Sequence, residues 1–142
     1  MAYIFLTDGD IEVSLQSHLI TANSADAPAL IFEKIEKSQI DFISAMLNSR
    51  YDMAVAFAQV DDERNGVLLE ILIKLVVYKF IKRNAARKVP EDAKDDYKWA
   101  MEQLEKIQAG KYYPGLPQYE DENGDTPLKP IYANNTKPEN YI

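Results

Sequence analysis

The stretch Val67–Ile81 constrains the fold more than any other part of this 142-residue chain. Twelve of its fifteen residues are apolar, and only Glu70, Lys74 and Lys79 interrupt the run. It is too short and too charged to span a bilayer, which needs about 20 apolar residues. A helix that is apolar on nearly every face must lie at the centre of a bundle, or another chain must bury its second side. We therefore expect a central helix and no membrane association.

Start and stop signals place three more helices around this one. We expect helices near residues 7–19, 28–50, 65–83 and 90–110, with a loop over residues 52–63. Thr7 and Asn65 are good N-caps, proline opens the second and fourth helices, and Gly110 is placed to end the last one in a left-handed conformation. The prediction is an all-α fold, a small four-helix bundle over residues 1–110. A bundle of this size is marginally stable unless it associates.

Apolar residues at helical spacing identify the buried sides of the first two helices. On the first helix they are Ile11, Leu15 and Leu19. On the second they are Phe32, Ile35, Phe42, Ile43 and Met46, and Ile31, Ile40 and Leu47 widen the stripe. We expect these side chains to pack against the central helix.

Residues 111–142 differ in composition from the bundle. Five of the seven prolines and five of the nine tyrosines lie here. Prolines oppose regular helices, but aromatic residues are scarce in disordered segments. We predict an extended tail that docks on another protein, in which Asn123–Gly124 forms a tight turn that could join two short strands of a β-hairpin. The candidate docking residues are Tyr112, Tyr113, Pro114, Tyr119, Tyr132 and Tyr141.

Residue types that carry chemistry are scarce. The chain has no Cys, five Gly and a single His, His18. This composition excludes disulfides and thiolate zinc sites, and it argues against Ser-His catalysis and phosphate-binding loops. The acids at 121–125 resemble a calcium loop, but Gly124 stands at the fourth position instead of the sixth. We expect no enzyme activity, no catalytic residue, no metal and no cofactor.

The net charge of −7 is unevenly distributed. Residues 1–63 hold three bases and eleven acids (−8), residues 64–110 hold ten bases and seven acids (+3), and residues 111–142 hold three bases and five acids (−2). An acidic chain is a poor candidate for wrapping nucleic acid, which requires a basic surface. The acidic and basic parts could attract each other within one molecule or between copies.

A predicted subunit interface follows from this charge distribution. Its acidic members are Asp8, Asp10, Glu12, Asp61, Asp62 and Glu63. Its basic members are Lys79, Lys82, Arg83 and Arg87, which line one side of the end of the central helix. The bases also suit the negative end of a helix dipole, which is a purely structural explanation. Trp99 is either a residue at the edge of the core or an interface anchor.

Three stretches resemble a known family. They are MAY at residues 1–3, ID at 40–41 followed by MLNSRY at 46–51, and YKWAMEQLEKIQAG at 97–110. They are similar to phrases of small head-tail connector (adaptor) proteins of tailed phages, in particular a family of unknown function from Mu-like phages. The resemblance covers about residues 1–115. The tail beyond Pro117 is longer than is usual in that family.

The resemblance implies a structural protein of the virion neck, made in the host cytoplasm. Such adaptors form a ring, commonly of about twelve copies, beneath the portal protein and extend the channel through which DNA leaves the capsid. The implied partners are further copies of this chain, the portal, tail or other neck proteins, and passing double-stranded DNA without sequence-specific binding. An acidic channel wall would let DNA slide without adhering. The alternatives are a dimeric helical regulatory module, a tail-completion protein and a carboxylate-dependent hydrolase.

Overall fold

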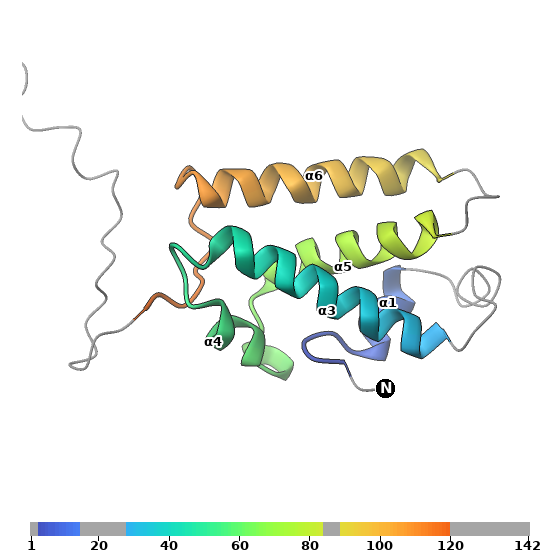
Figure 1. Cartoon of the computed structure of the whole chain (residues 1–142), viewed down its shortest axis with the longest axis horizontal. Coiled ribbons are helices and arrows are strands. Elements are labelled where there is room, and N and C mark those ends of the chain that lie inside the picture. Colours follow the sequence, from blue (N-terminus) through green and yellow to red (C-terminus); the bar gives the residue numbers. More distant parts are fainter. Residues whose placement is uncertain (1–2, 15–27, 84–88, 120–142) are drawn as a thin grey trace, which may run out of the picture.

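A computed structural model describes residues 3–14, 28–83 and 89–119, and these form five α-helices and one 3-10 helix. The helices are α1 (Asp8–Ser14), α3 (Pro28–Leu47), α4 (Met53–Ala58), the 3-10 helix η1 (Asp61–Glu63), α5 (Gly66–Lys82) and α6 (Glu91–Gln108). Figure 1 shows α3, α5 and α6 running along the long axis of the molecule, with α1 and α4 as shorter elements beside them. The described residues contain no strand, which confirms the all-α prediction. The predicted turn at Asn123–Gly124 lies outside these residues.

Helix α5 lies at the centre of the bundle, as its apolar sequence predicts. It contacts α1, α3 and α6, and its buried side chains include Ile71, Leu72, Leu75 and Val76. The ring of Phe80 stacks on that of Phe32 from α3, with their centroids 4.2 Å apart. Stacked aromatic pairs add about 0.5–1.5 kcal/mol beyond the burial of their area. This core fixes α3 and α6 on α5.

Local signals at the ends of α5 and α6 account for their bounds. The side chain of Asn65 accepts a hydrogen bond from the backbone N–H of Leu68 (3.0 Å), so the predicted N-cap is confirmed. Gly110 follows α6 with φ +74, the left-handed conformation that favours glycine. A Cβ atom at Gly110 would lie 2.9 Å from Nη1 of Arg50, whose Nε donates a 2.6 Å hydrogen bond to the carbonyl of Gln108. Glycine therefore both ends α6 and makes room for Arg50.

Helix α4 and η1 correct the prediction of a loop over residues 52–63. The carboxylate of Asp52 caps α4 by accepting from the backbone N–H of Val55 at 3.3 Å. Met53, Ala56 and Phe57, at positions i, i+3 and i+4, are buried. These three side chains form one apolar face of the helix. Six residues are too few to be helical alone, so packing of this face against the rest of the protein stabilises α4.

The buried side of α3 is rotated relative to the predicted stripe. Ile43 and Phe32 are buried as expected, and Leu47 is fully buried, but Phe42 is 40% exposed. The helix ends at Leu47 rather than Arg50, in a turn over residues 48–50. Of the stripe predicted for the first helix, Ile11 is buried, whereas Leu15 and Leu19 lie outside the described residues.

Residues 111–119 pack on the bundle rather than projecting from it. Leu116 is 4% exposed and belongs to the core. The backbone N–H of Asp52 donates to the carbonyl of Pro117 (2.8 Å), and Nδ2 of Asn65 donates to that of Pro114 (2.8 Å). The segment thereby covers the end of the bundle where α5 begins.

Candidate functional site

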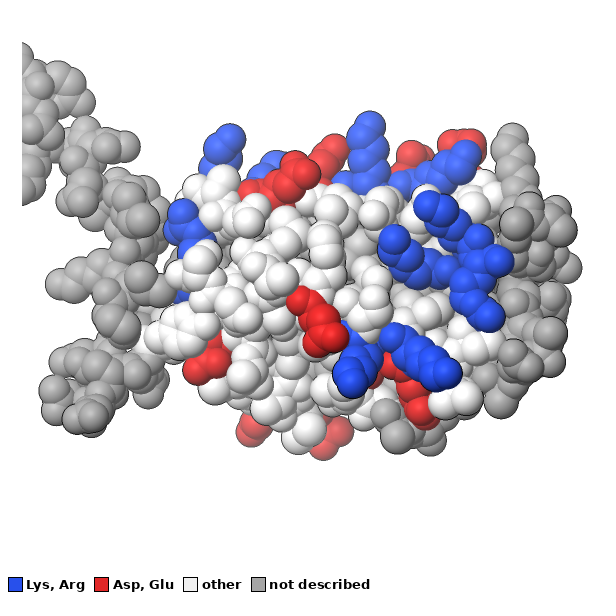
Figure 2. Space-filling model, viewed as in Figure 1, with Lys and Arg blue, Asp and Glu red and all other residues white. Residues whose placement is uncertain are grey.

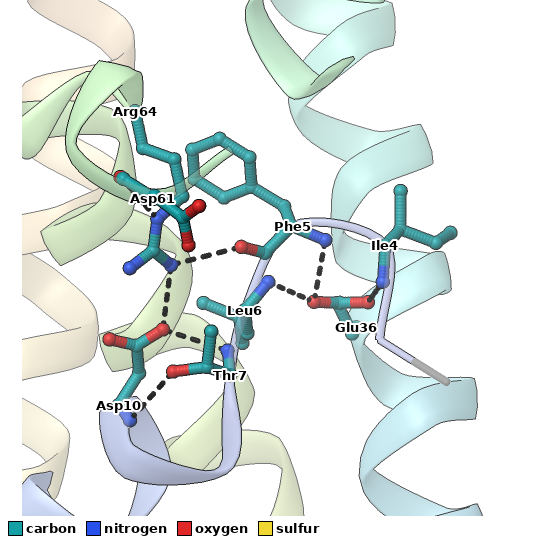
Figure 3. A network of polar contacts seen from close by, with 8 residues as sticks. All are labelled: Ile4, Phe5, Leu6, Thr7, Asp10, Glu36, Asp61 and Arg64. Atoms are coloured by element: carbon teal, nitrogen blue, oxygen red, sulfur yellow. Dashed lines mark hydrogen bonds and ion pairs between the residues drawn. The ribbon is translucent and has the colours of Figure 1, made fainter. Parts of the chain in front are cut away.

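A buried carboxylate holds the start of the chain against α3 (Figure 3). Glu36 is fully buried, and its Oε1 accepts a hydrogen bond from the backbone N–H of Ile4 at 2.6 Å. Its Oε2 accepts from the N–H groups of Phe5 (3.2 Å) and Leu6 (2.7 Å). A buried charge is tolerated when several donors satisfy it. The chain bends at residues 4 and 5, so three consecutive N–H groups face Glu36, which holds residues 4–6 against α3.

Arg64 ties the same segment to the residues that precede α5. Its Nη1 donates to the carbonyl of Phe5 (3.0 Å) and to Oδ2 of Asp10 (2.7 Å), and its Nε donates to the carbonyl of Asp61 (3.1 Å). The guanidinium also lies 5.7 Å from the centre of the Phe5 ring. Figure 3 shows these residues converging from three segments of the chain. Arg64 therefore joins the N-terminal segment, α1 and η1.

Asp10, a predicted interface residue, already forms an ion pair with Arg64 of its own chain. Burial acts to raise the pKa of Asp10, but hydrogen bonds from Arg64 and from Thr7, with the charge of Arg64, outweigh it and lower the pKa below its usual value. Thr7, the predicted N-cap, and Asp10 also form a capping box, since Thr7 N–H donates to Oδ2 of Asp10 (2.8 Å) and Asp10 N–H donates to Oγ1 of Thr7 (3.4 Å).

We expect Asp10→Asn to lower the free energy of unfolding by about 1–2 kcal/mol at pH 7, because Arg64 loses its charged acceptor. Since the folded pKa is depressed, the carboxylate stabilises the fold above its unfolded value of about 4, and this contribution is lost as the pH falls through the folded value. Urea unfolding at pH 7 and at about pH 2 should therefore give a difference from wild type that vanishes in acid. Asp8→Asn, at an exposed position, is the control. An equal difference at both pH values would contradict this account.

Within the described residues, Tyr3 is the other group whose pKa is shifted. Burial, followed by the negative charges of Asp8, Glu36 and Glu33, raises the pKa of Tyr3 above its usual value. Its side chain packs against the core, and its hydroxyl stays protonated to a higher pH than that of a free tyrosine.

The predicted acidic residues lie near the start of α5 or on α1. Asp61, Asp62 and Glu63, here called the acidic surface, are exposed on η1, which Arg64 separates from the N-cap Asn65. Asp8 and Glu12 are exposed on α1. Asp61 has φ +52, a conformation that Asp tolerates better than most residues. Acids at this position also suit the positive end of the α5 dipole.

The predicted basic residues lie at the other end of α5. Lys82 and Arg83 are exposed and Lys79 is half-buried; these three are here called the basic surface. Lys79 lies 5.6 Å above the ring of Tyr97. Figure 2 shows Lys and Arg side chains gathered over the end of the molecule where α5 ends and α6 begins. Arg87 lies outside the described residues. The acidic and basic surfaces are therefore separated by the length of α5, about 26 Å.

Trp99 is half-buried and packs against the core from α6. Nζ of Lys74 lies 5.3 Å from the centre of its ring and 2.7 Å from Oδ1 of Asp96. This cation–π contact and ion pair join α5 to α6 beside the indole. Trp99 thus has a structural role at the edge of the core, and its remaining exposed surface could still contact a partner.

Of the predicted docking residues, some are exposed and others contact the bundle. Tyr112 and Tyr113 are 38% and 50% exposed, and the ring of Tyr113 meets that of Tyr51 edge-on at 6.0 Å. The hydroxyl of Tyr119 donates a 2.7 Å hydrogen bond to the carbonyl of Asn48. The carbonyl of Pro114 accepts from Asn65. The predicted docking residues Tyr132 and Tyr141 lie outside the described residues.

The sequence interpretation missed Glu36 and Arg64, the two charged residues that hold the N-terminal segment in place. A signal for Glu36 exists, because Phe32, Glu36 and Ile40 follow one another at i, i+4 and i+8 on the buried side of α3. An acid inside an apolar stripe indicates a buried, partnered carboxylate. No comparable pattern surrounds Arg64, whose partners are mostly backbone carbonyls.

No described helix is long and apolar enough to cross a membrane. Within the same residues, no group of three or more His, Cys, Asp or Glu side chains could hold a metal ion.

Comparison with known proteins gave a match to a family model. The family model described as "Bacteriophage Mu, Gp36" matches residues 4–128, which is most of the chain. No curated protein and no solved structure matches this chain.

Proposed function

Because this chain belongs to the bacteriophage Mu Gp36 family and is thus a Mu-like phage protein, we propose that it is a head-to-tail connector of the phage neck. Membership in this family supports a structural or morphogenetic role, and this one observation carries the proposal. The protein forms a ring beneath the portal and extends the DNA channel. Its function is to assemble rather than to catalyse a reaction.

The charge distribution along α5 supports a ring. The acidic surface and the basic surface lie at opposite ends of this helix. A contact between the basic surface of one copy and the acidic surface of the next is heterologous, so it can repeat from copy to copy until the ring closes. Complementary charges of this kind orient partners and discourage wrong pairings. The net charge of −7 would also keep passing DNA from adhering to the channel wall.

Charge reversal tests the ring. We expect Lys82→Glu/Arg83→Glu to prevent ring formation, and Asp62→Lys/Glu63→Lys to do the same, because each places like charges at the contact. A protein that carries all four substitutions should form rings again. Lys98→Glu/Lys111→Glu, at exposed positions outside both surfaces, is the matched control. The measurements are light-scattering mass and electron microscopy with the portal protein of the same phage.

The images also separate the alternatives. Ring density directly beneath the portal supports the connector. A particle of two copies that leaves the portal bare would contradict it and favour a dimeric regulatory module. Density at the tail-side end of the neck would instead assign a tail-completion protein.

A further inference from the structure

A second face of α5, at the edge of the core, forms a groove with the start of α6. Its floor consists of Leu69, Ile73 and Val77, which are half-buried, and Ile81 extends it towards Pro90 and Ala93. This groove, here called the outer groove, encloses about 550 Å³. The apolar residues of α5 thus cover two sides of the helix, one in the core and one in the outer groove. A helix with a second apolar side gains stability when a partner covers it.

Charged residues form the rim of the outer groove. Glu70, Asp92, Asp96 and Lys74 lie here, three acids and one base, so the rim has a net charge of −2. Lys74 is already paired with Asp96 (2.7 Å) and lies 3.9 Å from Glu70. Asp92 is exposed and makes no ion pair within the described residues. The rim therefore favours an apolar segment that carries a positive charge.

The end of this chain has that chemistry. Residues 126–142 contain two lysines and one glutamate, a net charge of +1, whereas residues 120–125 contain four acids. Within the basic part, PLKPIY at 127–132 combines apolar side chains with Lys129 and with two prolines spaced as P-x-x-P. Segments with this spacing favour the polyproline II conformation and bind in apolar, aromatic-lined grooves at low entropic cost. Tyr78 lines the outer groove.

The direction of the chain favours a groove on a neighbouring copy. The hydroxyl of Tyr119 donates to the carbonyl of Asn48, just after α3, and residues 111–119 pack on the end of the bundle opposite the one where α5 ends and α6 begins (Figure 1). The eight residues from there to Pro127 can span at most about 28 Å. In the proposed ring this end of the bundle, where the acidic surface lies, faces the basic surface at the end of the next copy's α5, so a segment of this length can reach the part of that copy's outer groove beside Pro90.

We infer that residues 127–132 of each copy bind in the outer groove of the next copy. The inference rests on the proposed ring, since a tail-to-groove contact is heterologous and repeats around it. In the bound state Leu128 and Ile131 cover Leu69, Ile73 and Val77, and Lys129 pairs with Asp92.

Disulfide cross-linking between two full-length single-cysteine variants tests this contact. The chain has no cysteine, so Val77→Cys and Ile131→Cys each introduce a unique thiol. When the two proteins are mixed and oxidised, we expect a disulfide-linked pair joining positions 77 and 131, identified by mass spectrometry of the linked peptides. Val55→Cys, on the exposed side of α4, replaces Val77→Cys as the control and should link at least tenfold less. Equal linkage of both would overturn the inference. So would a double variant, Val77→Cys/Ile131→Cys, that links only within one chain.

A charge exchange gives a second readout that does not depend on the cysteine variants. Asp92→Lys and Lys129→Glu should each weaken association of subunits about threefold or more, and the two together should restore it. Glu102→Lys, exposed on α6 outside the groove, should have no effect. Rings on the portal without linkage at position 77 would refute the groove contact alone. A chain that neither forms rings nor binds the portal would refute the proposed function.

Discussion

Replacing Glu36 by alanine is expected to lower the free energy of unfolding by about 3–5 kcal/mol. The carboxylate is fully buried and accepts hydrogen bonds from three consecutive backbone N–H groups, those of Ile4, Phe5 and Leu6. Without it these donors lose their acceptor, and each unsatisfied buried group costs about 1–3 kcal/mol. The N-terminal segment should detach and expose Phe5 and Leu6. Urea unfolding of the full chain, with hydrogen exchange at residues 4–6, measures both effects.

Glu36→Gln sharpens the test because it keeps the shape and removes only one acceptor. Its amide oxygen can still accept from Phe5 and Leu6, but its NH₂ group then faces the N–H of Ile4. We expect a loss of about 1–2 kcal/mol, between wild type and alanine. Lys37→Ala, at the exposed next position of α3, should change stability by less than about 0.5 kcal/mol. If glutamine were as destabilising as alanine, the charge rather than the individual hydrogen bonds would hold the segment.

The central helix was predictable because its cause is local in sequence. An apolar run on nearly every face has one low-energy location, the middle of a bundle, and Asn65 marks its start by its own side chain. The same holds for the end of α6, where glycine at position 110 is the residue best suited to φ +74. Each of these features depends on a few neighbouring residues.

The features that were not predicted depend on partners far away in the chain. Glu36 bonds to residues about 30 positions earlier, and Arg64 bonds to Phe5 and Asp10, 59 and 54 positions away. Helix α4 needs the core to cover Met53 and Phe57, so its six residues resemble a loop when taken alone. Phe42 was misassigned because α3 carries apolar residues on more than one side, and only packing decides which side is buried.

In the candidate site, too, some features follow from local sequence and others depend on partners far away in the chain. The opposed charges at the two ends of α5 follow from sequence order once the helix is identified. The ion pair between Asp10 and Arg64 could not be predicted from the sequence, because only the fold brings α1 beside η1. Exposure therefore separates the acids that can meet another subunit, such as Asp62, from one that already has a partner.

Ending the chain after Tyr119 is expected to abolish assembly on the portal while leaving the helical body folded. Within the described residues, the tail contributes buried Leu116 to the core and the carbonyls of Pro114 and Pro117 to hydrogen bonds with the body. Loss of residues 120–142 therefore removes no described contact of the body but removes the segment proposed to join copies. Circular dichroism and urea unfolding should be close to wild type, whereas electron microscopy should show portals without a ring.

Ending the chain after Lys111 should have a different result, because it removes Leu116 from the core. We expect the body to lose about 3 kcal/mol or more, since Leu116→Ala in the full chain should by itself cost about 2–4 kcal/mol. Failed assembly of this shorter chain would thus reflect instability and would not test docking. The chain that ends at Tyr119 does test it. Normal rings from that stable body would contradict any docking role for residues 120–142 and would leave the charged surfaces of α5 and η1 to hold the copies together.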